Sequence, residues 1–130
     1  MTEMGADNAM MPMNEPGMME AMETRAEEVA QRLSLMSNAK RLLILCTLGD
    51  KEMSVGALQA SLGIGQSSLS QHLGKLRQAE ILSTRRDGQM IFYRISDMQT
   101  VSIMASLYET FCKPNKEAAI AETLGADEAA

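Results

Sequence analysis

Apolar side chains recur at steps of three and four residues along much of the chain, the spacing of a helix with one buried face. This pattern predicts a first helix over residues 19–36. The pattern continues in a second helix that runs to Leu48, with Ser37 or Asn38 as its N-cap. We therefore expect the first part of the chain to be helical.

Two further helices are predicted on either side of a tight turn. Ser54 is suited to cap a short helix that ends near Ser61, and the sequence LGIG at 62–65 forms the turn. A longer helix then extends from Gln66 to about Ala79. A short helix, a glycine-containing turn and a longer helix form a helix-turn-helix.

The pattern then changes to β-prone residues. Two strands are predicted at 81–86 and 90–95, and they are joined by Asp87 and Gly88. An Asp-Gly pair between two such runs is a strong signal for a β-hairpin. A hairpin that follows a helix-turn-helix forms a wing.

A last helix is predicted after the hairpin. Ser96 and Gln99 have the spacing of a capping box, and Pro114 ends the helix. The expected fold is mainly helical with a two-stranded β wing: four helices, the hairpin and a fifth helix, in the arrangement of a winged helix-turn-helix.

The composition divides the chain into three segments. We expect residues 1–18 to be a disordered, Met-rich acidic tail, residues 19–114 to form the folded domain, and residues 115–130 to be a flexible or frayed helical acidic tail. No apolar run approaches the roughly 20 residues of a membrane span, so no membrane partner is expected. No secretory signal is visible, which predicts a cytoplasmic protein whose cysteines are reduced at rest.

The net charge of −5 is unevenly distributed. Residues 1–31 carry seven acids and one base, and residues 114–130 carry four acids and one base. Residues 32–113 carry ten bases and six acids, a net charge of +4. Because DNA binding depends on local charge, a basic body with acidic ends is compatible with it.

The longer helix of the helix-turn-helix and the hairpin carry groups that bind DNA. The helix presents hydroxyls, amides and an imidazole, and the hairpin adds a basic tip suited to phosphates or to the minor groove. The candidate DNA-binding residues are Gln66, Ser67, Ser68, Ser70, Gln71, His72, Lys75, Arg85, Arg86, Gln89 and Arg94. Taken singly, each is compatible with a solvated polar face. Together they favour double-stranded operator DNA as the partner.

Residues 33–114 resemble an ArsR-type bacterial repressor. The resemblance is carried by LGIGQSSLSQHLGKLRQAEIL at 62–82, which is similar to the recognition helix of that family, and by RRDGQMIFYRIS at 85–96, which is similar to its wing. It implies a homodimer built on the first and last helices, in which residues 19–114 serve both DNA binding and dimerisation. It also implies repression that an inducer relieves.

Two metal sites known in ArsR-type proteins are missing from this sequence. One uses two cysteines where EMSVGAL, at 52–58, has Ser54 and Gly56. The other begins with Asp-x-His in the last helix, where this chain has Asp97-Met98-Gln99, and it has Thr110 and Lys113 at the later histidine positions. His72 is the only histidine, and a lone histidine is more often structural than a metal ligand. We expect neither a metal nor another cofactor.

The only cysteines are Cys46, in the second helix, and Cys112, near the end of the last. Their placement resembles the sulfide-responsive subgroup of the family, of the SqrR and BigR kind. That resemblance implies that both thiols react with a persulfide or polysulfide inducer and form a sulfur bridge within one subunit, with Tyr108 as a neighbour. Chemically, a thiolate attacks a sulfane sulfur and the second thiolate closes the bridge by exchange. A plain disulfide needs Cα atoms roughly 4.4–6.8 Å apart, and a polysulfide spans more.

Other functions remain open at this point. A buried cysteine is often only a small apolar residue. One alternative is the same DNA-binding repressor with another inducer: peroxide, disulfide stress or a thiophilic ion such as As(III). An enzyme that moves sulfane sulfur or reduces peroxide is disfavoured, because the sequence has no C-x-x-C motif and the nearest base before Cys46 is Arg41. We therefore expect a protein that is not an enzyme.

Overall fold

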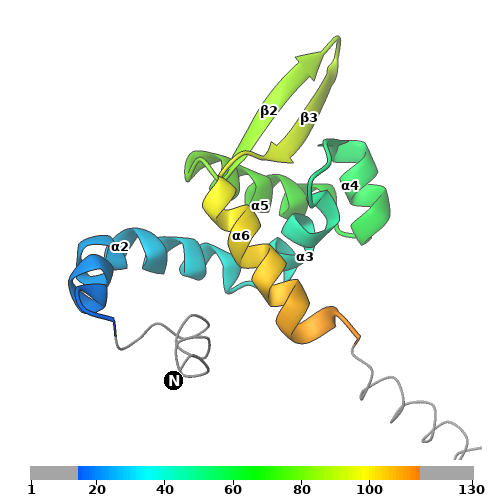
Figure 1. Cartoon of the computed structure of the whole chain (residues 1–130). Coiled ribbons are helices and arrows are strands. Elements are labelled where there is room, and N and C mark those ends of the chain that lie inside the picture. Colours follow the sequence, from blue (N-terminus) through cyan, green and yellow to red (C-terminus); the bar gives the residue numbers. More distant parts are fainter. Residues whose placement is uncertain (1–14, 115–130) are drawn as a thin grey trace, which may run out of the picture. The chain divides into compact units, whose positions relative to one another are not determined.

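The structure, a computed structural model, describes residues 15–114. The chain divides into two compact units, Met1–Leu42 and Leu43–Ala130. The elements are α2 (Met18–Met36), α3 (Ala39–Leu48), β1 (Met53–Ser54), α4 (Val55–Leu62), α5 (Gln66–Gln78), β2 (Leu82–Asp87), β3 (Met90–Ile95), α6 (Met98–Leu107) and the π-helical turn η1 (Tyr108–Cys112). Figure 1 labels the α-helices and the two longer strands. The predicted winged helix-turn-helix is confirmed. The predicted tails fall mostly on residues 1–14 and 115–130, outside the described residues. The predicted N-terminal tail was too long by a few residues, because a turn precedes Met18 and α2 begins there, with Gly17 as its N-cap.

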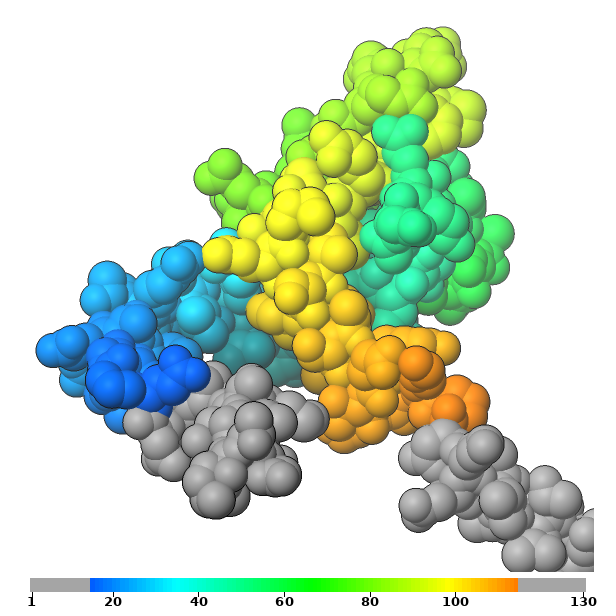
Figure 2. Space-filling model, viewed as in Figure 1, coloured from blue at the N-terminus to red at the C-terminus, as the bar shows by residue number. Residues whose placement is uncertain are grey.

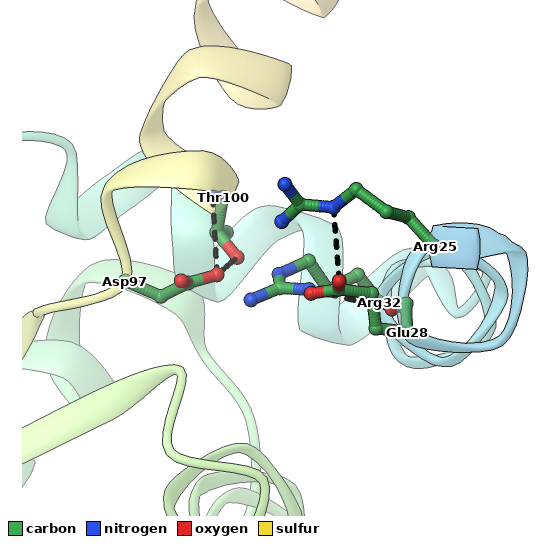
Figure 3. A network of polar contacts seen from close by, with 5 residues as sticks. All are labelled: Arg25, Glu28, Arg32, Asp97 and Thr100. Atoms are coloured by element: carbon green, nitrogen blue, oxygen red, sulfur yellow. Dashed lines mark hydrogen bonds and ion pairs between the residues drawn. The ribbon is translucent and has the colours of Figure 1, made fainter. Parts of the chain in front are cut away.

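Helix α2 forms most of the described part of the first unit. On its surface the Glu28 carboxylate accepts hydrogen bonds from Arg25 Nε at 2.9 Å and from Arg32 Nη1 at 3.2 Å (Figure 3). These hydrogen bonds, the one from Arg25 first, hold the pKa of Glu28 below its ordinary value. Exposed pairs of this kind add little to stability. They lie on a helix that also exposes the apolar side chains of Met19 and Leu33.

The junction between α2 and α3 decides between two predicted caps. The Asn38 side chain accepts a hydrogen bond from the backbone N–H of Arg41 at 3.1 Å, so Asn38 caps α3. The Ser37 hydroxyl instead donates to the carbonyl of Ser34 at 2.7 Å, at the end of α2. Arg41 Nε donates to the carbonyl of Leu35 at 2.6 Å and so links the two helix ends.

The second unit has an aliphatic core drawn from its helices and its sheet. Its buried apolar residues are Ile44, Leu45, Leu48, Leu58, Leu69, Leu73, Leu76, Ile81, Leu82 and Ile95. Ser54 caps α4 as predicted, because its hydroxyl accepts from the backbone N–H of Ala57 at 3.1 Å. Three of the core leucines lie at helical spacing along α5. That helix therefore buries one face and leaves the other free for a partner.

The sheet has one more strand than the sequence predicted. Its three antiparallel strands follow the order β1-β3-β2. The added strand β1 pairs Met53 with Tyr93 and Ser54 with Phe92. A two-residue strand is too short for alternation to reveal it, and it forms because β3 offers a free edge.

The hairpin turn lies one residue later than predicted. Asp87 still belongs to β2 and pairs with Met90, so the two turn residues are Gly88 and Gln89. Gly88 has a φ of +65°, in the left-handed region that glycine enters without steric cost. Figure 1 shows the resulting β2–β3 hairpin, the wing, extending away from α5.

Helix α5 ends with an unusual residue. Glu80 has a φ of +63°, the only such value among the described residues that are not glycine. Its N–H donates to the carbonyl of Arg77 at 2.9 Å, and the N–H of Ile81 donates to the carbonyl of Leu76 at 3.0 Å. This is a Schellman motif, in which glycine usually occupies the position of Glu80.

The cap of α6 differs from the prediction. Asp97, and not Ser96, is the N-cap, and its carboxylate accepts from the backbone N–H and the hydroxyl of Thr100 at 3.2 and 2.5 Å (Figure 3). Ser96 is unavailable because its hydroxyl pairs with that of Ser83 at 2.5 Å, and its backbone N–H donates to the carbonyl of Ile81. The helix ends in the π-helical turn η1, just before Pro114.

Candidate DNA interface and cysteine pair

Helix α5 presents most of its predicted DNA-binding residues to solvent. Gln66, Ser67, Ser70, Gln71 and Lys75 are exposed, while Ser68 and His72 are half-buried. The exposed residues lie on the side opposite the buried leucines. Their hydroxyl and amide groups are therefore available to base edges, and the lysine is available to a phosphate.

The wing distributes its arginines over two faces. In the β2–β3 register Arg85 lies opposite Phe92, and Arg86 lies opposite Ile91. Because side chains alternate along a strand, Arg85 and Arg94 share one face and Arg86 lies on the other. All three are exposed, as is Gln89 at the turn. Figure 2 shows the tip of the wing standing clear of the rest of the second unit.

Arg85 is engaged within the protein. Its Nε and Nη2 donate to the two carboxylate oxygens of Glu52 at 3.0 and 2.8 Å. Its Cζ also lies 4.7 Å from the centre of the Phe92 ring, and its Nη1 is 4.0 Å from Asp87 Oδ2. The hydrogen bonds from Arg85 hold the pKa of Glu52 below its ordinary value. Of the predicted wing cations, Arg86 and Arg94 remain the better candidates for phosphate contact.

A hollow lies between the helix-turn-helix and the wing. It has a volume of about 370 Å³ and is lined by the start of α4 at Ser54–Gly56, by Gln66 and Ser70 on α5, and by Gln89 in the wing. The fold thus brings predicted residues of α5 and of the hairpin to one surface. Its polar groups are hydroxyls and side-chain amides, and Met90 and Ile91 add an apolar part.

Both cysteines lie in the second unit and are free and exposed. Cys46 lies on α3, and Cys112 is the last residue of η1. The pKa of Cys46 is raised, first by partial burial and second by the negative charge that Cys112 carries when it ionises.

A cavity opens beside Cys46. Its volume is about 310 Å³, and its walls include Leu45, Val101, Met104 and Tyr108. The lining also includes the carboxylate residue Asp50 at the end of α3. Tyr108 thus lies beside Cys46, as expected, whereas Cys112 does not line the cavity. Sequence patterns do not reveal this cavity, because its walls come from α3, β3, α6 and η1.

The positions of the two missing metal sites have structural roles in this chain. Ser54 caps α4, and Asp97 caps α6. Within residues 15–114, no group of three or more His, Cys, Asp or Glu side chains is arranged to hold a metal ion. In the same range no helix is long and apolar enough to cross a membrane.

The fold and these sites correspond to known proteins. A sequence profile described as "Bacterial regulatory protein, arsR family" matches residues 38–84. The chain is 46% identical over 99 residues to the biofilm growth-associated repressor of Xylella fastidiosa, which covers 76% of this chain and 87% of that protein. The chain belongs to the arsR family. It is therefore a DNA-binding transcriptional regulator, as the sequence predicted.

Other arsR-family proteins share the same architecture. The transcriptional activator HlyU of Vibrio cholerae is 37% identical over 105 residues, which cover 81% of this chain and 94% of that protein. The crystal structure of the transcriptional repressor BigR from Xylella fastidiosa superposes with a TM-score of 0.69 at 45% identity, over 73% of this chain and 97% of that chain. The resemblance to BigR-like repressors is confirmed.

Proposed function

We propose that this arsR-family protein is a repressor that loses affinity for its operator when Cys46 and Cys112 are joined by sulfur from a persulfide. The observation that carries the proposal is the cavity that Cys46 and Tyr108 line together, because Tyr108 begins the η1 turn that ends at Cys112. Both thiols are free and exposed, and a bridge between them would tie η1 to α3.

The proposed chemistry is a sequence of sulfur transfers. The Cys46 thiolate attacks the outer sulfur of a persulfide R–S–SH, which leaves Cys46–S–SH and releases the thiol R–SH. Cys112 reacts in the same way with a second donor. One protein persulfide then attacks the inner sulfur of the other, which leaves a trisulfide between the residues and releases H₂S. If Cys112 attacks before its own transfer, the product is a disulfide, and H₂S is again released.

The bridge would act on DNA binding through a homodimer. The proposed dimer uses α2 and the α6–η1 segment, and it is supported by their exposed apolar side chains, which include Leu33 at 50% and Phe111 at 78% exposure. A change at η1 would then alter the separation of the two α5 helices. A hundredfold loss of operator affinity requires only about 2.7 kcal/mol of coupling.

The assignment of individual DNA contacts is a separate proposal. We assign base contacts to Gln66, Ser67, Ser70 and Gln71 and phosphate contacts to Lys75, Arg86 and Arg94, with Gln89 at the edge of the hollow. This assignment is supported by the exposure of each of these residues and by the hollow that Gln66, Ser70 and Gln89 line together. Ser68 and His72, which are half-buried, are assigned a supporting position.

Mass spectrometry tests the inducer. The reduced protein is treated with a persulfide donor, with hydrogen peroxide or with diamide, and the mass of the peptide pair containing Cys46 and Cys112 is measured. We expect additional sulfur atoms in the bridge only after the persulfide donor. A plain disulfide after all three treatments would contradict sulfur insertion and would favour a peroxide or disulfide-stress sensor.

A further inference from the structure

Three side chains, two from the strands of the wing and one from the residue before β1, meet on one face of the sheet. Glu52 directly precedes β1, Arg85 lies on β2 and Phe92 lies on β3. Since the strand order is β1-β3-β2, Glu52 and Arg85 lie on either side of β3, the strand that carries the phenyl ring. The guanidinium lies over this ring while its Nε and Nη2 donate to the two carboxylate oxygens of Glu52. The contact therefore crosses the full width of the sheet.

We propose that Glu52 is a positioning residue that fixes the direction of the wing through Arg85, and that Arg85 does not bind phosphate. We name the contact of Glu52, Arg85 and Phe92 the wing clamp. The proposal rests on the assignment of the wing to the DNA interface. It changes the expected role of Arg85 and gives a role to an acidic residue beside a nucleic-acid surface.

The geometry of the clamp supports this role. A bidentate arginine–carboxylate contact fixes both the position and the plane of the guanidinium, and stacking on an aromatic ring restricts it further. The backbone pairing of β1 with β3 covers only two residues, so it gives the hairpin little lateral support. The clamp adds a side-chain contact between the wing and the segment before β1.

The clamp is exposed to solvent. Its effect on the direction of the wing can therefore be measured apart from its effect on the stability of the fold. Side-chain exposures of 52% for Arg85 and 31% for Glu52 leave the ion pair accessible to water and salt. Such pairs change global stability only slightly. The main effect of breaking the clamp should therefore appear in DNA binding, while the melting temperature stays nearly constant.

The alternative, direct phosphate contact by Arg85, predicts the opposite result for one substitution. In Glu52→Gln the guanidinium loses its carboxylate partner. If Arg85 binds phosphate, its release tightens DNA binding and steepens the dependence on salt, because one more cation displaces counterions. If Arg85 positions the wing, binding weakens although a negative charge has been removed.

The experiment uses the full-length protein and the DNA duplex that the wild type enriches from a random-sequence library. Dissociation constants are measured over a range of salt concentrations for Glu52→Gln and for the matched control Glu80→Gln, which removes an exposed acid at the end of α5 and leaves the partners of Arg85 in place. We expect Glu52→Gln to weaken binding about two- to five-fold relative to Glu80→Gln, with an unchanged salt slope. Equal or tighter binding with a slope steeper by about one would overturn the proposal.

A charge exchange gives a second, independent readout. Glu52→Arg and Arg85→Glu should each weaken binding, and the double substitution should recover most of the loss, because the ion pair is rebuilt with its charges exchanged. No recovery would overturn the clamp, since a glutamate at position 85 repels phosphate if that position faces DNA. If the library enriches no duplex at all, the DNA-binding assignment fails, and that result is distinct from both outcomes.

Discussion

The thiol of Cys46 shows how a residue's surroundings set its reactivity. Partial burial and the neighbouring Cys112 both raise its pKa. Only the thiolate attacks sulfur, so reaction at Cys46 should be slow at neutral pH and should accelerate as pH rises above the ordinary range of a thiol.

The rate of alkylation by iodoacetamide, followed at the Cys46 peptide, measures this pH dependence. In Cys112→Ser the charge of Cys112 is removed while the partial burial remains. The midpoint of the rate profile should therefore move to lower pH and stay above that of a free cysteine. An unchanged midpoint would contradict the proximity of the two thiols.

Asp97 is a residue whose position the sequence identified and whose role it did not. It stands where related metal sites begin, and here its carboxylate caps α6 and accepts from the buried Thr100. Asp97→Ala should lower the free energy of unfolding by about 1–2 kcal/mol, because it leaves the helix end and the threonine hydroxyl without this acceptor.

Urea unfolding measures the effect of Asp97→Ala. Asp97→Asn is the matched control, since its amide oxygen can still cap the helix, and it should cost less. A larger loss in Ser96→Ala than in Asp97→Ala would instead indicate that the predicted capping box is the one that matters.

At the scale of elements, the end of α5 stores backbone strain. Glu80 is exposed and adopts a left-handed conformation that costs a residue with a side chain about 1–2 kcal/mol. Glu80→Gly should therefore stabilise the protein by about 1 kcal/mol. Urea unfolding tests this, with Ala79→Gly as the control that should destabilise, because Ala79 has a negative φ of −84°. A loss of stability in Glu80→Gly would contradict the strain.

The recognition helix and the wing should contribute separate phosphate contacts. Lys75→Ala and Arg86→Ala should each weaken DNA binding at moderate salt and reduce the salt slope by about one, because each removes an exposed cation. Fluorescence anisotropy with a labelled duplex over a salt series gives both quantities. An unchanged slope in either variant would exclude a phosphate contact at that residue.

The sequence predicted the elements where a pattern repeats and missed those where it does not. The spacing of Leu69, Leu73 and Leu76 was enough to define α5 and its buried face. Strand β1 has too few residues to show alternation, and its pairing depends on β3, which is distant in sequence. The π-helical form of η1 was also not predicted, because its sequence continues the apolar spacing of α6.

At the scale of the whole molecule, sensing and DNA binding should be separable. Cys46→Ser and Cys112→Ser should each bind the operator as the wild type does, because neither residue belongs to the proposed DNA surface. Each should lose release by a persulfide donor, since one thiol cannot form the bridge. Anisotropy measured before and after the donor tests both statements. Full release in either single variant would exclude the two-thiol mechanism.

The functional surfaces were predictable as far as they depend on residue type and order. Exposed hydroxyl, amide and basic groups on α5 and the wing followed from the sequence, as did the two cysteines. The engagement of Arg85 did not, because Glu52 lies 33 residues away and the two meet only when the sheet forms. The cavity beside Cys46 was likewise inaccessible to sequence reasoning, since four separate elements enclose it.

The cavity next to Cys46 also makes the protein open to synthetic control. The apolar walls beside the Cys46 sulfur are suited to bind a small compound that carries an electrophile. Its apolar part would fill the cavity, and its electrophile would react with the thiolate of Cys46. Such a compound would engage one cysteine permanently and would prevent its neighbour from completing a bridge.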